Sequence, residues 1–163
     1  MTTETVSTPT TLRLPAELYN SPTFLLKRLG FTAKERAMEA YERSGLGPYH
    51  HAVLAVLDEG TRETQGQIAD ALGYDRGQLV GLLDELEERK LVERRRDPAD
   101  RRRHTVTMTP EGQRALADLR TLARKLEDEF LAALDDDERA QLHALLGRLA
   151  ADHLPHCSFT KPA

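Results

Sequence analysis

Residues 72–109, LGYDRGQLVGLLDELEERKLVERRRDPADRRRHTVTMT, decide the fold of this chain. Their pattern predicts a short amphipathic helix from about Asp75 to Arg89, then strands from Leu91 to about Arg96 and from about His104 to Met108. The connection between the strands, residues 97–103, is too polar for a core and contains a proline and two aspartates, which favours a hairpin tip. The stretch therefore predicts a helix followed by a β-hairpin.

Positive charge is concentrated in this hairpin. Between Arg89 and Arg103 there are eight basic residues against three acidic ones, a local charge of +5 in a chain whose formal net charge is −4. A basic island beside a helix, on an otherwise acidic protein, is typical of a nucleic-acid site. The acidic total argues against a protein that coats any DNA, and it allows a specific binder whose positive charge lies on one face.

The residues before this stretch predict three further helices, over about 21–44, 48–60 and 64–72. Ser21-Pro22 and Pro48 are typical helix starts, and Thr64-x-x-Gln67 has the form of a capping box. Gly73 suits the end of the third helix. Two short helices joined by a tight turn, with a hairpin behind them, predict a winged helix-turn-helix.

The residues after the hairpin predict two long helices. Thr109 is expected to cap the first, with Pro110 at its first position, and the second begins at Asp135 to Glu138 and ends before Pro155. Their apolar stripes are Leu116, Leu119, Ala123, Leu126, Phe130 and Leu134, then Leu142, Leu145, Leu146 and Leu149. Because these stripes present more apolar surface than a wing domain can cover, we expect the helices to dimerise, together with the first helix.

The expected fold class is mainly α with a small β-hairpin wing, a winged helix-turn-helix domain plus N- and C-terminal dimerisation helices. The expected parts are a flexible lead (1–20), a helical dimerisation region (21–47 and 110–154), the winged helix-turn-helix (48–109) and a tail (155–163).

The expected location is the cytoplasm. The sequence has no run of 18 apolar residues, so we expect no membrane partner, and the first residues lack the pattern of a signal peptide. The single cysteine, Cys157, excludes an internal disulfide, which agrees with a reducing compartment.

The helix from Asp75 has an apolar face and a candidate DNA-reading face. At 100° per residue, the apolar stripe contains Leu79, Leu82, Leu83 and Leu86, which we expect in the core. The candidate DNA contacts are Asp75, Arg76, Gly77, Gln78, Val80 and Gly81. Arg suits guanine and Gln suits adenine, whereas Asp84 and Glu88 would repel phosphates, so only the first two turns should enter a groove. The alternative is an exposed helix surface with tolerated glycines.

The candidate DNA contacts of the wing are Arg94, Arg95, Arg96, Asp100, Arg101, Arg102 and Arg103. We expect Arg101 to Arg103 to contact the DNA backbone or a minor groove, and Asp100 to hold an arginine by a charge-assisted hydrogen bond. A run of charge is usually a solvated face, but this one lies between two strands.

These motifs resemble the signature of MarR-type regulators, over about Ser21 to Leu154. The residues that carry the resemblance are Leu72-Gly73, Leu86-Glu87, Leu91-Val92, Arg94, Asp97-Pro98-x-Asp100-x-Arg102 and Thr109-x-x-Gly112. The resemblance implies a triangular homodimer that binds pseudo-palindromic operators, usually as a repressor, and that loosens its hold on DNA when a ligand enters between the dimerisation helices and the wing domain. Two residues depart from the pattern: Lys90 stands where the family usually has Gly, so that this turn is expected to be strained or shaped differently, and Gly81 stands where it often has Arg or Lys.

A sensor site is harder to place. Tyr41, Arg43, Tyr49, His50 and His51 lie around the junction of the first two predicted helices, where family pockets open, and would suit a small aromatic or carboxylate ligand. Packing and surface roles for these residues are an equally good interpretation.

Other kinds of site are disfavoured. Without a cysteine near the N-terminus or any Trp, the thiol-based peroxide sensor and the urate-type pocket of some relatives do not fit. His153-x-x-His156-Cys157 offers three metal ligands, but a solvated tail is the favoured interpretation. No cofactor is expected, nor an enzyme, because no motif groups a nucleophile, a base and an orienting residue.

The sequence thus predicts a homodimeric regulator that binds double-stranded DNA. Two other classes stay open: a winged-helix scaffold that binds proteins, and a sensor of a small molecule or metal for which DNA is secondary.

Overall fold

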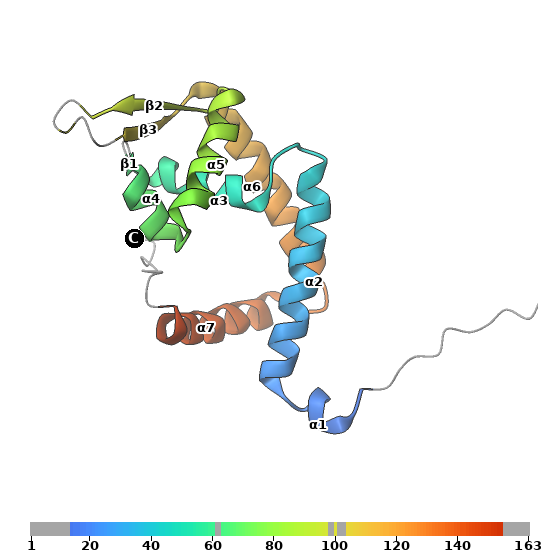
Figure 1. Ribbon diagram of the computed structural model, residues 1–163. Coiled ribbons are helices and arrows are strands. Elements are labelled where there is room, and N and C mark those ends of the chain that lie inside the picture. Colours follow the sequence, from blue (N-terminus) through green and yellow to red (C-terminus); the bar gives the residue numbers. More distant parts are fainter. Residues whose placement is uncertain (1–13, 61–62, 98–99, 101–103, 155–163) are drawn as a thin grey trace, which may run out of the picture. The chain divides into compact units, whose positions relative to one another are not determined.

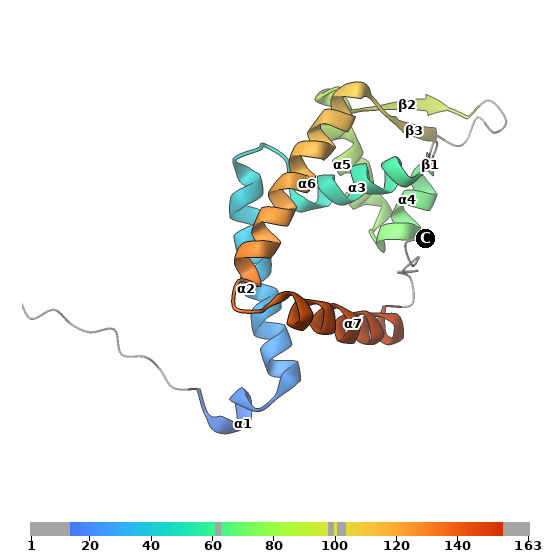
Figure 2. The ribbon, with the colours of Figure 1, turned by 180° about the vertical axis from the view of Figure 1, so that it is seen from behind.

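The computed structural model describes residues 14–60, 63–97, 100 and 104–154. The chain divides into two compact units, residues 1–35 and 36–163. The elements, shown in Figure 1 and from behind in Figure 2, are α1 (Ala16–Tyr19), α2 (Pro22–Glu42), α3 (Pro48–Glu59), β1 (Glu63–Thr64), α4 (Gln65–Leu72), α5 (Arg76–Glu88), β2 (Val92–Arg96), β3 (His104–Met108), α6 (Pro110–Phe130) and α7 (Asp136–His153). The predicted class, mainly α with a β-hairpin wing, is confirmed.

The helices begin where the sequence predicts caps. Thr64 and Gln67 form the reciprocal capping box of α4, and Thr109 Oγ1 accepts the N–H of Gly112 at the start of α6. Asp135 and Glu138 form a second capping box at α7. Each of these side chains satisfies backbone N–H groups that the first helical turn leaves without a partner.

The sheet has three strands in the order β1-β3-β2, all antiparallel. In the wing, Val92 is opposite Met108, Arg94 opposite Val106 and Arg96 opposite His104. The sequence predicted only the two wing strands, because β1 is two residues long and too short for any alternation. The order leaves β2 as an outer strand, with one row of backbone groups not bonded to β3.

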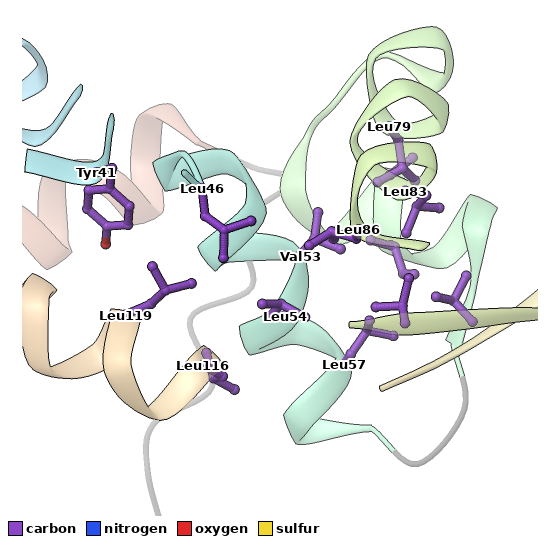
Figure 3. Packing of buried hydrophobic residues seen from close by; sticks show 14 residues of the cluster. Tyr41, Leu46, Val53, Leu54, Leu57, Leu79, Leu83, Leu86, Leu116 and Leu119 are labelled. Carbon is purple, nitrogen blue, oxygen red and sulfur yellow. The ribbon is translucent and has the colours of Figure 1, made fainter. Parts of the chain in front are cut away.

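One core holds the second unit together (Figure 3). Its buried members extend from Tyr41 in α2 to Leu119 in α6. From α5 it receives Leu79, Leu83 and Leu86, as predicted, whereas Leu82 is only partly buried against this core. Burying each leucine contributes about 1.5–3 kcal/mol, so this face fixes the orientation of α5.

Two regions lack such a core. In the described part of the first unit, residues 14–35, no side chain is buried, and Leu26, Leu29 and Phe31 are exposed. Helix α7 likewise has no buried residue, and Leu145, Leu146 and Leu149 are exposed. Among the described residues no helix is both long and apolar enough to cross a membrane.

Candidate nucleic-acid interface

The helix that carries the candidate base contacts ends in a left-handed turn. Lys90 has φ 60°, its N–H donates to Glu87 O at 2.9 Å, and the N–H of Leu91 donates to Leu86 O at 2.9 Å. Gly73 makes the same kind of turn, with φ 63°, after α4. A residue with a Cβ costs roughly 1–2 kcal/mol in this conformation, so the Gly-to-Lys departure keeps the shape of the turn and stores strain in it.

The wing is joined to α6 directly behind this turn. Thr109 Oγ1 donates to Lys90 O at 2.7 Å, and the N–H of Thr109 donates to Leu91 O at 3.0 Å. A Cβ on Gly112 would lie 2.1 Å from Leu91 O, so only glycine permits this approach. The separate motif pieces around Leu91 and Thr109 therefore meet at one joint, which fixes the base of the wing to α6.

The first two turns of α5 present the candidate reading face. The Asp75 carboxylate accepts the N–H groups of Gly77 (2.8 Å) and Gln78 (3.2 Å), so it holds the helix start. The side chains of Arg76, Gln78 and Val80 are exposed, Val80 to 43%. A Cβ on Gly81 would meet nothing within 4 Å, so no packing requires that glycine.

A hollow of about 470 Å³ lies beside this face. It is lined by Thr64, Gln65, Gly66, Gln67, Asp70, Arg76, Leu79, Val80 and His104. It therefore joins the N-terminal turns of α4 and α5 to the first residue of β3. His104 and the start of α4 were not among the sequence-based candidates, because only the fold brings them beside Arg76.

The arginines of β2 differ in environment. Strand alternation places Arg94 on the face of Val92, which is buried, and turns Arg95 to the other face. Arg94 is 21% exposed, whereas Arg95 is 76% exposed and pairs with Glu93 at 2.8 Å. Arg96 is exposed. Asp100 is partly buried, and Arg101, Arg102 and Arg103 lie outside the described residues.

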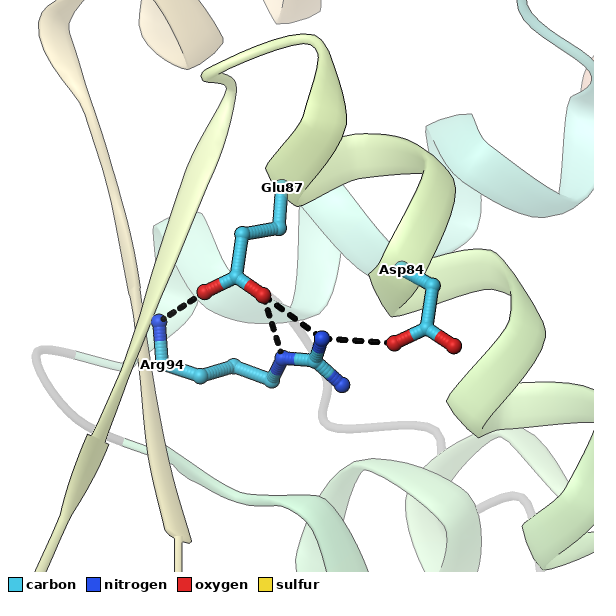
Figure 4. A network of polar contacts seen from close by, with 3 residues as sticks. All are labelled: Asp84, Glu87 and Arg94. Atoms are coloured by element: carbon cyan, nitrogen blue, oxygen red, sulfur yellow. Dashed lines mark hydrogen bonds and ion pairs between the residues drawn. The ribbon is translucent and has the colours of Figure 1, made fainter.

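Arg94 turns back onto α5 (Figure 4). Its Nε and Nη2 donate to Glu87 Oε2 at 2.9 and 2.6 Å, and Nη2 also lies 2.5 Å from Asp84 Oδ1. The side-chain hydrogen bonds from Arg94 lower the pKa of Glu87, and the bond to Glu87 raises the pKa of Arg94. In the sequence Arg94 is grouped with its neighbours by charge, and the structure separates it from them.

The five candidate ligand residues lie in different environments. The hydroxyl of Tyr41 lies 2.7 Å from Nδ1 of His51, whose pKa is lowered by burial and then by Arg120. His50 is buried, and its Nδ1 accepts the N–H of Gly47 at 2.9 Å. Its Nε2 lies 2.9 Å from Glu85 Oε2, outside hydrogen-bond geometry. Tyr49 packs edge-on against Tyr74.

Only Arg43 of those five lines a second hollow, of about 550 Å³, between the C-terminal part of α2 and α6. Its lining is Arg36, Glu39, Ala40, Arg43, Ser44, Leu122, Lys125, Leu126 and Glu129. The charges include three cations and two carboxylates, over an apolar floor. Arg36 and Lys125 were not among the predicted ligand residues, because Arg36 lies earlier in α2 than the helix junction and Lys125 lies on α6, far away in the sequence.

No metal site forms in the described part of the chain. His153 is exposed on α7 with Nε2 3.8 Å from Asp152 Oδ2, while His156 and Cys157 lie outside the described residues. Within the described ranges, no group of three or more His, Cys, Asp or Glu side chains is placed to hold a metal ion.

Comparison with known proteins agrees with this geometry. Residues 44–103 match the model of the MarR family. A protein of Thauera aromatica, described as a transcriptional regulatory protein for the hcr operon, is 33% identical in an alignment of 129 residues that covers 74% of this chain and 78% of the relative. A MarR-family regulator from Rhodococcus sp. RHA1 has a crystal structure similar at a TM-score of 0.71, with 32% identity over 78% of this chain and 91% of that one.

The repressor CouR, solved on a 23-mer DNA duplex, is similar at a TM-score of 0.77, with 34% identity over 85% of this chain and 99% of that one. CouR from Rhodococcus jostii RHA1 bound to p-coumaroyl-CoA is also similar, at a TM-score of 0.71 and 28% identity, over 83% of this chain and 96% of that one.

Proposed function

The chain belongs to the MarR family of transcriptional regulators, and from this we propose that it is a homodimeric repressor of a pseudo-palindromic operator, released by a small acidic ligand. It acts in the cytoplasm by binding alone, without catalysis. The observation that carries the proposal is the reading face of α5, which opens beside a hollow and a basic wing in a fold that matches a DNA-bound repressor.

The proposed DNA contacts divide into two kinds. Arg76, Gln78 and Val80 on the first turns of α5 read base edges in the major groove, where Val suits the methyl group of thymine. The exposed Arg95 and Arg96 bind phosphates or a minor groove, and so do Arg101 to Arg103, which lie outside the described residues. Affinity then falls steeply with salt, because each neutralised phosphate releases counterions.

The proposed dimer is made by the N- and C-terminal helices, which carry exposed leucines. Residues 21–47 and 110–154 form the dimerisation region, residues 48–109 form the DNA-binding domain, and residues 1–20 and 155–163 are the lead and the tail. The exposed leucines of α2 and α7 supply the apolar surface for the contact. A twofold axis would place the two α5 helices in successive major grooves about 10 bp apart.

The proposed ligand is an aromatic acid or its coenzyme A thioester, bound in the hollow between α2 and α6. A volume of about 550 Å³ suits a small molecule. Arg36, Arg43 and Lys125 would hold an acidic group, while Leu122 and Leu126 would contact the ring. The structure of CouR with p-coumaroyl-CoA supports this chemical class.

The test is fluorescence anisotropy of the full chain on DNA from directly upstream of its own gene, at several salt concentrations, with scrambled DNA as competitor. We expect tight binding that resists the competitor and weakens steeply with salt. Aromatic acids and their thioesters are then titrated into the complex. Weak binding without sequence preference would overturn the repressor proposal and favour a protein-binding scaffold, and a ligand that raises the melting temperature without affecting DNA binding would favour a sensor.

A further inference from the structure

The contact between α5 and the wing assigns a different role to one of the basic residues. We infer that Arg94 is a positioning residue: it fixes the wing strand β2 on the recognition helix α5 and neutralises the carboxylates of Asp84 and Glu87, and it is not itself a phosphate ligand. This inference rests on the proposed binding of DNA.

The side chain of Arg94 is directed toward α5. Arg94 lies on the same face of β2 as the buried Val92, and opposite the buried Val106 of β3. Its guanidinium is occupied by Glu87 Oε2 and Asp84 Oδ1 on the neighbouring helix (Figure 4). A guanidinium held by two carboxylates has lost most of the positive potential that would attract a phosphate.

Glu87 binds strand β2 through both of its carboxylate oxygens. While Oε2 accepts from the Arg94 side chain, Oε1 accepts the backbone N–H of Arg94 at 3.1 Å. Because β2 is the outer strand of the sheet, this N–H belongs to the row that β3 does not satisfy. One carboxylate thus holds main chain and side chain of the same residue, which fixes the position of β2 along α5.

Arg94 also neutralises negative charge on α5. Asp84 and Glu87 are one turn apart on α5, 57% and 39% exposed, on the helix that enters the groove under the proposed function. Without Arg94 both would be unpaired carboxylates facing the phosphates of DNA, and like charges across an interface oppose binding. Arg94 therefore supports DNA binding by neutralising the carboxylates of Asp84 and Glu87.

The decisive variant is one that removes Arg94 together with the charges it covers. Arg94→Ala should bind the upstream DNA about 10- to 100-fold more weakly. Arg94→Ala with Asp84→Asn and Glu87→Gln should bind at least about tenfold more tightly than Arg94→Ala and keep the salt dependence of the wild type, because the repelling charges are gone and an amide oxygen at position 87 can still accept the backbone N–H of residue 94. If Arg94 binds a phosphate, the triple variant stays weak and the slope of log K against log salt falls by about 0.9, which would overturn the inference.

Two matched controls are available. One substitutes the neighbouring Arg95, and the other keeps the aliphatic part of the side chain at position 94. Arg95→Ala removes an exposed arginine from the same strand and should lower the salt slope, and Asp84→Asn with Glu87→Gln should not restore its affinity. Arg94→Met keeps the packing of the aliphatic part of the side chain. If Arg94→Ala fails to fold, as judged by thermal melting, Arg94→Met replaces it in both the single and the triple variant.

A measurement without DNA separates this inference from the proposed function. In Glu87→Ala the amide hydrogen of Arg94 loses its acceptor, so its exchange with solvent, measured by NMR, should become at least about tenfold faster. Arg95→Ala should leave that rate unchanged. If the wild type shows no preference for the upstream DNA, the proposed function fails and the exchange rate decides the inference: an unchanged rate in Glu87→Ala would refute it.

Discussion

The burial of apolar side chains differs between two regions, the winged-helix region from Tyr41 to Leu119 and the last helix, α7. The first buries its large side chains in a core of its own, with Leu54, Leu79 and Leu83 fully enclosed. The second, 18 residues long, buries none of its residues and exposes a row of leucines. The difference teaches that a single chain completes the core of the winged-helix part, whereas the leucines of α7 stay exposed and offer the apolar surface that the proposed dimer would cover.

The largest effect is expected inside the self-sufficient region. Gly112→Ala would place a Cβ 2.1 Å from Leu91 O, a clash with backbone that no side-chain movement relieves. We expect a loss of about 3 kcal/mol or more in the free energy of unfolding, measured with urea. Gly81→Ala is the matched control, because its Cβ meets nothing within 4 Å, and should stabilise by up to about 1 kcal/mol. Equal effects at the two glycines would contradict the joint between wing and α6.

The next effect concerns α7. Leu145→Glu with Leu149→Glu places two charges on its exposed apolar row. We expect the dimer to dissociate at least about 100-fold more readily, as seen by sedimentation, because burying an unpaired charge is costly. The core of the winged helix should persist in the monomer. Gln141→Glu, an exposed polar position on the same helix, should leave the dimer intact. A double variant that remains fully dimeric would remove α7 from the interface.

A smaller effect is expected at the end of α5. Lys90→Gly removes the backbone strain of a lysine in the left-handed conformation, and it should raise the free energy of unfolding by about 1 kcal/mol. Gly73→Ala in the corresponding turn of α4, with φ 63°, should lower it by a similar amount. A destabilised Lys90→Gly would mean that contacts of the lysine outweigh its backbone strain.

The smallest effect is a dependence on pH. Burial, and then Arg120, lower the pKa of His51 in the folded chain, so the unfolded chain binds more protons below pH 6.5. The melting temperature should therefore fall as the pH drops from 6.5 through the folded pKa, and be unaffected by His51 above 6.5. His51→Gln should flatten this part of the profile. A profile that remains as steep in the variant would assign the titration to another group.

Much of the fold could be predicted from the sequence because its signals are local. The cap at Thr64, the turn at Gly73 and the bounds of β3 each depend on residues within one or two turns. Strand β1 could not be predicted from the sequence, because a two-residue strand is defined only by its pairing with β3.

The candidate site was less predictable, since charge alone does not give direction. Arg94, Arg95 and Arg96 look equivalent in a charge count. Strand alternation turns Arg95 away from the face of Val92, but only the contacts with Glu87 and Asp84 distinguish Arg94 from the exposed Arg96. The hollow between α2 and α6 depends on how two distant helices pack, which no local pattern encodes.

The joint at Gly112 also makes α6 a mechanical lever. The helix has 21 residues, a rod of about 31 Å, whose first turn is fastened to the base of the wing. A tilt of about 5° around that fulcrum carries the far end at Phe130 through about 3 Å. A displacement of that size at Phe130 would therefore correspond to only a small rotation of the wing. The close backbone contact at Gly112 would couple the two movements tightly.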